Sequence, residues 1–129
     1  MANFAVTPSQ DINQYSGTNL SGSTITFSTY TRFNYNIRIS VSTEINVGIA
    51  ASGTLTVFLN GTSIKTMNYR NGSGFLGTNT LTCAITEFGD AMYYLLNGIL
   101  LAGNNNLTFS VSSGNTTSCN YSVSVVFSL

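Results

Sequence analysis

Early in the chain the sequence reads Phe33-Asn34-Tyr35-Asn36-Ile37-Arg38-Ile39-Ser40-Val41-Ser42. Every odd position of this stretch is apolar and every even position is polar. Successive side chains of a β-strand point to opposite faces of the sheet, so this alternation predicts a strand with one face in a core and the other in water. The stretch therefore indicates a sheet that is packed on one side and solvated on the other.

The same period of two recurs further along the chain, in residues 81–86, in residues 106–112 and at the C-terminus, where Cys119, Tyr121, Val123, Val125, Phe127 and Leu129 alternate mostly with Ser or Asn. Residues 54–59 and 63–69 flank Asn60-Gly61, a dipeptide suited to the positive φ values of a type I′ hairpin turn. Turn signals come about every ten residues, a spacing typical of sandwiches and barrels. We predict an all-β fold, an antiparallel and jelly-roll-like β-sandwich of about eight to ten strands.

The run from Asp90 to Leu101 departs from this pattern because it is apolar on both faces. Such a run is either a short helix or a strand buried on both sides, and we favour a strand with a turn at Asn97-Gly98. One side would then pack in the core and the other against a neighbouring subunit, and a wholly buried segment is the alternative. The residues predicted to contact a neighbour are Tyr93, Tyr94 and Leu96.

The N-terminal part of the chain carries isolated apolar residues among many Ser, Thr and Gly. We predict that residues 1–23 form an extended arm or linker and that residues 24–129 form the sandwich domain. Within the arm, Ala2, Phe4 and Val6 alternate with Asn3 and Ala5, which is enough for one short strand. Such a strand can pair within its own domain or add to the sheet edge of another copy, so these three residues are further predicted assembly residues.

The charge content is the most unusual feature of the composition. Charged residues make up only 6% of the chain, against about 25% in a typical globular domain. Four basic and four acidic residues give a net charge of zero, so no long-range field holds identical copies apart. The basic residues are scattered, which argues against a nucleic-acid partner. We expect the main partner to be the chain itself, as a homo-oligomer, trimer or polymer.

The residues needed for most enzyme mechanisms are absent. The chain has no His, which removes Ser-His-Asp and Cys-His catalysis and the usual zinc and copper ligand sets. Its four carboxylates show no acidic repeat of the kind that a calcium site draws on. We predict that the protein is not an enzyme and that it holds no cofactor or metal ion.

Cys83 and Cys119 both point inward by the alternation of their strands. They permit one disulfide, and two buried free thiols are the alternative. The N-terminus has no basic leader with an apolar run, and no stretch of about 18 consecutive apolar residues occurs, so we expect neither a signal peptide nor a membrane span.

The order of strands and turns resembles the compact jelly-roll domains of the C1q and TNF-like group, especially the forms in collagen-like glycoproteins and appendages of bacterial spore surfaces. The similarity covers roughly residues 30–129, with a strand like Tyr35–Val41, a hairpin like Val57–Gly61, a segment like Leu100–Phe109 and a final strand like Ser122–Leu129. Two departures are an Asn at position 104, where the group has Asp, and the absence of a preceding collagen-like tract. The resemblance implies a trimer around an apolar axis, with the N-terminal arm linking trimers into a fibre or attaching them to a layer.

These observations together predict a structural, self-assembling subunit of an extracellular fibre, appendage, coat or capsid, placed at the surface of a cell, spore or virion. The alternative is a carbohydrate-binding, lectin-like module or a receptor-binding head with glycans as its partners. That alternative uses the loops at residues 70–79 and 113–119 and assigns a glycan contact to Asn71. The absence of Trp counts against it, because Trp is the ring most useful for stacking on sugars.

Overall fold

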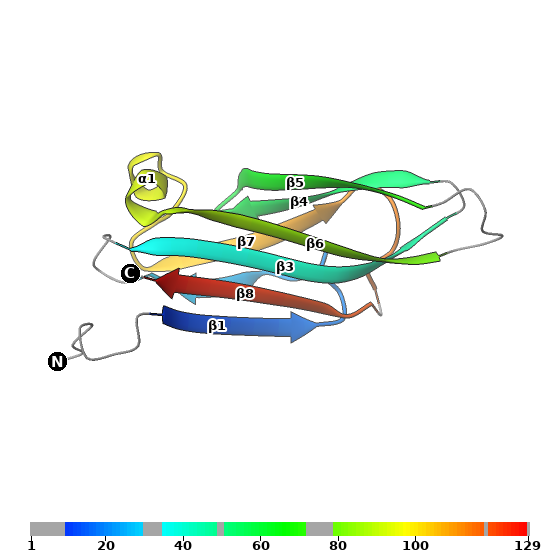
Figure 1. Cartoon of the computed structure of the whole chain (residues 1–129), viewed down its shortest axis with the longest axis horizontal. Coiled ribbons are helices and arrows are strands. Elements are labelled where there is room, and N and C mark those ends of the chain that lie inside the picture. Colours follow the sequence, from blue (N-terminus) through cyan, green and yellow to red (C-terminus); the bar gives the residue numbers. More distant parts are fainter. Residues whose placement is uncertain (1–9, 30–34, 49–50, 72–78, 118, 129) are drawn as a thin grey trace.

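The structure is a computed structural model that describes residues 10–29, 35–48, 51–71, 79–117 and 119–128. Within these residues it contains eight strands and one short helix (Figure 1). The elements in chain order are β1 (Gln10–Gly17), β2 (Ile25–Ser28), β3 (Asn36–Val47), β4 (Ser52–Leu59), β5 (Thr62–Arg70), β6 (Asn79–Asp90), α1 (Ala91–Leu96), β7 (Asn104–Val111) and β8 (Tyr121–Ser128).

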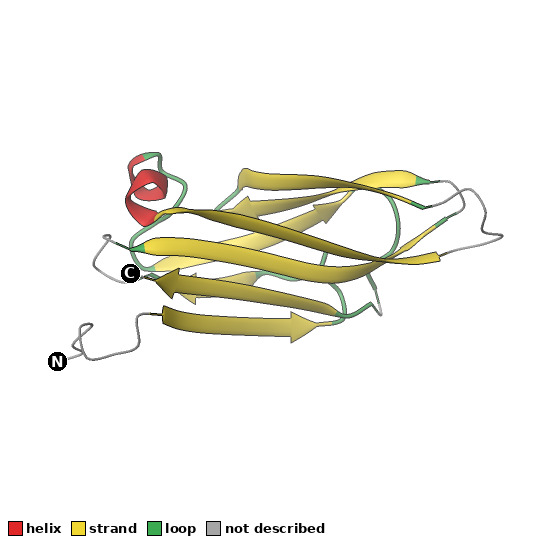
Figure 2. Ribbon diagram, in the orientation of Figure 1, coloured by secondary structure: helices red, strands yellow, loops and turns green. Residues whose placement is uncertain are grey.

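The strands form two four-stranded sheets, in the orders β1-β8-β3-β6 and β2-β7-β4-β5, and neighbouring strands are antiparallel (Figure 2). Four of the pairings are β1 with β8, β2 with β7, β3 with β6 and β4 with β5. The chain is thus a nested set of four strand pairs that wraps into a sandwich, which is the eight-stranded jelly roll. The predicted all-β, antiparallel sandwich is confirmed.

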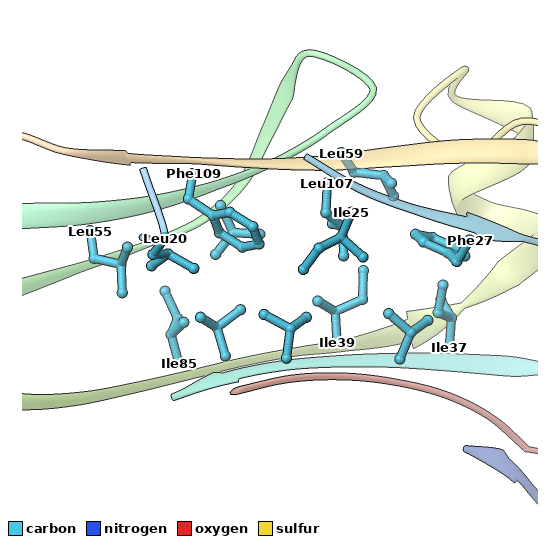
Figure 3. Packing of buried hydrophobic residues seen from close by; sticks show 14 of the residues in the cluster. Leu20, Ile25, Phe27, Ile37, Ile39, Leu55, Leu59, Ile85, Leu107 and Phe109 are labelled. Atoms are coloured by element: carbon cyan, nitrogen blue, oxygen red, sulfur yellow. The ribbon is translucent and has the colours of Figure 1, made fainter. Parts of the chain in front are cut away.

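The core lies between the two sheets and is built by the alternation that the sequence predicted. In β3 the side chains of Ile37, Ile39 and Val41 are buried, whereas those between them are not. Ile39 faces Leu107 of the other sheet, and Ile37 faces Phe27 (Figure 3). Burying one such aliphatic side chain stabilises the fold by about 1.5–3 kcal/mol, so the inward rows of both sheets hold the sandwich together.

The turn between β4 and β5 has the predicted type I′ geometry. Asn60 has a φ of 51° and Gly61 a φ of 84°, the pair of left-handed conformations that a two-residue hairpin of this type requires.

The favoured strand at residues 91–101 is wrong, because this run begins with the helix α1. The Asp90 carboxylate caps the helix by accepting a hydrogen bond from the Met92 backbone N–H at 2.9 Å. Ala91 and Tyr94 are the buried residues of the helix, and their spacing of three is a helical period that the short run concealed. The expected turn is present, since Asn97 ends the helix and Gly98 follows with a φ of 71°.

The expected arm at residues 1–23 also needs correction, because β1 is the edge strand of a sheet. It pairs with β8 over its whole length, from Gln10 opposite Ser128 to Gly17 opposite Tyr121, and Leu20 is fully buried in the core. The inward positions of an edge strand lie at the rim of the core and tolerate polar residues, so β1 lacks the apolar alternation that marks a central strand. Ala2, Phe4 and Val6 lie outside the described residues.

Cys83 and Cys119 are both buried, and both are free thiols. Cys83 of β6 pairs with Thr43 of β3, and Thr43 pairs with Tyr121 of β8. The strand β3 therefore lies between Cys83 and the start of β8, which begins two residues after Cys119. The predicted burial is confirmed and the disulfide does not form.

Candidate assembly surface

The outward faces of both sheets are built largely from neutral polar side chains that bond to one another across strands. Thr26 donates to Asn106 at 2.8 Å, Ser28 to Asn104 at 2.9 Å, and Thr80 to Asn46 at 2.6 Å, in each case from the hydroxyl to the amide oxygen. These bonds occupy polar groups that would otherwise be free to bind water. The outward faces of both sheets therefore carry few charged side chains.

Exposed apolar side chains gather in one part of the chain. Six large apolar residues of the described part are exposed, and five of them lie between positions 88 and 101. Their exposed fractions are 56% for Phe88, 41% for Met92, 60% for Tyr93, 77% for Leu96 and 47% for Leu101. Apolar groups concentrated in this way mark an interaction surface more often than single scattered ones do. We call Met92, Tyr93 and Leu96 the α1 surface.

The helix presents this surface because its other side is anchored in the sandwich. Ala91 is fully buried and its backbone N–H donates to the Tyr35 carbonyl at 3.0 Å. Tyr94 is in the core cluster, and its carbonyl accepts from the backbone N–H groups of Ile99 and Leu100 at 2.9 and 3.1 Å. The helix therefore stands at the end of β6 (Figure 1). Its three residues Met92, Tyr93 and Leu96 remain exposed to solvent.

Two of the three residues predicted in this run are accessible to a partner. Tyr93 and Leu96 are exposed, whereas Tyr94 is buried beneath the helix and belongs to the core. The assignment of Tyr94 to an assembly contact is therefore corrected. Its ring lies over Gly89, where an added Cβ would be 2.6 Å from the Tyr94 Cε2 atom.

The loop after α1 is held by two asparagines: Asn105, which sequence reasoning did not single out, and Asn60, for which it predicted only a role in the turn. Asn105 is fully buried. Its amide nitrogen donates to the carbonyls of Leu101 and Gly103, both at 3.0 Å, and its amide oxygen accepts from the Leu101 backbone N–H at 2.7 Å. Asn60 donates to the same oxygen and to the Ile99 carbonyl, both at 2.8 Å. This network fixes the exposed Leu101 against the β4–β5 turn.

A second apolar feature crosses the outer face of β1-β8-β3-β6. Ile12 pairs with Val126, Val126 with Arg38, and Arg38 with Phe88, so these four residues form one row, which we call the outer row. Ile12 is 55% exposed and Phe88 is 56% exposed, whereas Val126 is covered by its neighbours and only 4% exposed. The only sequence signal for this row is Val126, which breaks the alternation of β8. The register that joins the four strands is not readable from the sequence.

In the described part of the chain, burial shifts the pKa of three ionisable groups that belong to the core. Burial raises the pKa of Tyr69 and of the Cys83 thiol. Burial also raises the pKa of Tyr94, and the nearby Glu87 carboxylate adds to that effect. The described residues include no group of three or more His, Cys, Asp or Glu that could hold a metal ion, and none of their helices has the length and apolarity needed to cross a bilayer.

Asn71, the residue assigned to a glycan contact, has a structural role. Its side chain is fully buried and donates to the carbonyls of Val47 and Gly48 at 3.0 and 2.7 Å. Its backbone N–H donates to the Ala51 carbonyl at 2.8 Å. Asn71 thus ties the end of β5 to the β3–β4 connection, and positions 72–78 of the same loop lie outside the described residues.

Comparison with known proteins finds a similar fold and identifies no family for the chain. No family model matches the chain, and no curated protein matches it. Dimeric latent PorU from Porphyromonas gingivalis is similar in structure, with a TM-score of 0.55 and 11% identity over 92% of this chain and 13% of the PorU chain. The insecticidal delta-endotoxin Cry8Ea1 from Bacillus thuringiensis matches with a TM-score of 0.42 and 12% identity over 91% of this chain and 19% of that one. At these identities the similarity to PorU concerns the fold alone, and the chain spans only a small part of either protein.

Proposed function

We propose that the protein is a structural, self-associating subunit of an extracellular assembly such as a fibre, appendage, coat or capsid. The observation that carries this proposal is the α1 surface, where Met92, Tyr93 and Leu96 are together exposed to solvent on an anchored helix. Nothing in the net charge of zero opposes contact between identical copies.

The energetics favour a partner for this surface. Covering a large apolar side chain is favourable by about 1.5–3 kcal/mol, and association costs about 4–15 kcal/mol in lost freedom of motion. The α1 surface alone therefore supports a weak contact, and a stable assembly uses further contacts. Under this proposal Ala2, Phe4 and Val6 supply one of them, as a strand added to the sheet edge of a neighbour. The trimer of the C1q and TNF-like group, on a spore, cell or virion surface, is the assembly that the sequence resemblance favours.

Native mass spectrometry and negative-stain microscopy of the full chain test the proposal. We expect oligomers that grow with protein concentration. In a Tyr93→Lys/Leu96→Lys variant the assembly is lost, because two charges would have to be buried in the contact. The matched control is Thr66→Lys/Ser110→Lys, which adds the same charge at exposed positions on the outer face of β2-β7-β4-β5.

A second variant lacks residues 2–8 and keeps β1, which begins at Gln10. We expect it to fold and to form smaller assemblies than the full chain. A protein that stays monomeric at every concentration would overturn the proposal, as would a Tyr93→Lys/Leu96→Lys variant that assembles like its control. Circular dichroism of each variant shows that the sandwich is retained.

A further inference from the structure

We propose that the outer face of β1-β8-β3-β6 docks on the same face of a second copy, about a two-fold axis parallel to the strands, so that Ile12 of each copy contacts Phe88 of the other. This inference rests on the proposed function, since it names the surface and the symmetry of one self-contact. It uses the outer row and is separate from the α1 surface.

The symmetry of the sheet leads to this arrangement. The axis lies between β8 and β3, the two central strands of the sheet. The two-fold rotation about it places β1 of one copy over β6 of the other and β8 over β3. Each row of one copy then faces the same row of the other copy. Ile12 on one edge strand then meets Phe88 on the other edge strand, and the contact occurs twice. A two-fold contact of this kind uses one patch on both copies, as most homodimers do.

The exposures of the two residues favour a second copy as the occupant. Ile12 and Phe88 are 55% and 56% exposed and lie at opposite edges of the same row. No contact within the sandwich can bring them together, because β8 and β3 lie between them. The two-fold contact covers both in each copy.

The neighbouring rows permit close approach of the two faces. On one side of the outer row, the next row contains Gln14, Ser124, Ser40 and Thr86, and the row after it contains Ser16, Ser122, Ser42 and Ala84. These two rows are neutral, and most of their side chains are short, which allows close approach of two such faces. On the other side, the adjacent row contains Gln10, Ser128, Asn36 and Asp90, and the same axis places Asp90 over Gln10 of the other copy. Two β-sheets that stack face to face lie about 10 Å apart.

The charges on the face are compatible with the same axis. Arg38 of one copy lies over Val126 of the other, because β3 exchanges with β8. Glu44, whose backbone N–H donates to the Asn120 carbonyl at 3.1 Å, lies over Asn120 of the other copy. Arg38 therefore does not meet Arg38, and Glu44 does not meet Glu44, so like charges are kept apart.

The area of the face is sufficient for a reversible dimer. Four strands spaced about 4.8 Å apart, each with about eight residues rising about 3.3 Å, cover about 500 Å². Two copies then bury about 1,000 Å², the lower end of specific interfaces. We therefore expect a dimer that dissociates on dilution.

Thiol cross-linking in mixtures of single variants tests the geometry, with a short bifunctional maleimide because facing residues of two stacked sheets are too far apart for a direct disulfide. When Ile12→Cys protein is mixed with Phe88→Cys protein and treated with this reagent, we expect a cross-linked dimer, in which the second Ile12–Phe88 contact remains intact. Each variant treated alone should link much more slowly, because identical positions are about three strand spacings, or about 14 Å, apart along the sheet. The native Cys83 and Cys119 are buried, and the unmodified chain serves as their control.

Two further mixtures separate this arrangement from others. Phe88→Cys with Ser16→Cys places the thiols two rows apart, so it should link slowly. The mixture of Phe88→Cys and Thr82→Cys proteins tests for a different dimer, whose two-fold axis is perpendicular to the strands. In that dimer Arg38 faces Glu44 of the other copy. That arrangement would also weaken with added salt, whereas a contact between neutral rows does not.

Native mass spectrometry of the unmodified chain distinguishes the two proposals. If the chain is monomeric at every concentration, both fail. If it associates but the Ile12→Cys and Phe88→Cys mixture links no faster than the Ser16→Cys mixture, this inference is overturned and the proposed function stands. Faster linking with Thr82→Cys likewise overturns it.

Discussion

At the residue scale, Asn105 shows how a polar side chain can serve a protein core. Its amide has two N–H donors and an oxygen with two lone pairs. Leu101 and Gly103 accept from the nitrogen, while Leu101 and Asn60 donate to the oxygen. Every polar valence of this buried side chain is therefore used, and the loop between α1 and β7 depends on it.

We expect Asn105→Leu to destabilise the fold by about 2–4 kcal/mol, because the change removes the four hydrogen bonds of this buried amide, including those that its oxygen accepts from the Leu101 backbone N–H and the Asn60 side chain. Urea unfolding followed by circular dichroism measures the loss. Asn104→Ala is the control, because Asn104 is exposed and accepts only from Ser28. Equal losses in the two variants would show that the network adds nothing to stability.

The sequence could not reveal this role, for a physical reason. Asn105 shares the inward parity of Leu107 and Phe109 in β7, but a polar residue at the start of an apolar alternation looks like the end of the strand. The network also joins Asn60 to a loop that lies 39 residues away in the sequence. Only the folded chain brings these groups together.

At the element scale, the central strands could be predicted from the sequence, whereas the edge strand β1 and the helix α1 could not. The alternation in residues 33–42 predicted β3, because one face of that strand must be buried. The dipeptide Asn60-Gly61 predicted the β4–β5 hairpin, because these residues readily take the positive φ values of its turn. β1 was missed because Asn13 and Gly17 occupy its inward positions. A short helix at α1 was one of two alternatives, and the strand was favoured because six residues hold too few turns for a 3.6 period to show.

Tyrosine rings that lie over glycines support the ends of these elements. Tyr121 lies over its cross-strand partner Gly17, and Tyr94 lies over Gly89 beneath α1. An added Cβ at Gly89 would be 2.6 Å from Cε2 and 2.7 Å from the hydroxyl oxygen of Tyr94. A side chain at residue 89 would therefore force the end of the Tyr94 ring to move.

We expect Gly89→Ala to destabilise the fold by about 1–3 kcal/mol, through forced movement of Tyr94 and its helix. The loss should fall when the ring is already absent, so Gly89→Ala should cost less in a Tyr94→Leu background. Urea unfolding of the four proteins of this cycle gives the coupling. Gly48→Ala is the matched control, since nothing lies within 4 Å of its added Cβ. Strict additivity in the cycle would contradict the proposed clash.

At the scale of the whole molecule, one part of the candidate assembly surface could be predicted from the sequence and another part could not. Tyr93 and Leu96 were predictable, because an apolar run in a neutral chain indicates a covered surface. The outer row was not, since its residues come from four strands and only their register unites them. A surface made within one segment can be recognised in the sequence, and a surface made across a sheet cannot.

The buried ionisable groups predict loss of stability in alkali. Burial raises the pKa of Tyr69 and Tyr94 above the model-peptide value of 10.0 and that of Cys83 above 9.0. A raised pKa in the folded state favours the protonated form there, so its stabilising effect is complete below the unfolded pKa and is lost as the pH rises through the folded pKa. We expect a Tm that is constant from neutral pH to about 9 and that falls above about 10.

Thermal melts across this range, with absorbance of the tyrosinate form as a second signal, check the expectation. Tyr94→Phe cannot ionise, so its melting temperature should fall less steeply in alkali than that of the unmodified chain. Identical slopes for the two proteins would show that Tyr94 ionisation is not coupled to unfolding.

The nested strand pairing also has a consequence for the route by which the chain folds. The β4–β5 pair closes over the two residues Asn60 and Gly61, whereas β1 and β8 come from opposite ends of the described chain. The entropy lost in closing a loop grows with the length of free chain between the ends. Once β4–β5 has formed, β3 and β6 are drawn together, and each later pair then closes a loop that the earlier ones have already shortened. The least costly order of assembly therefore runs outward from the Asn60-Gly61 turn, and the edge strand β1 is the last to join its sheet.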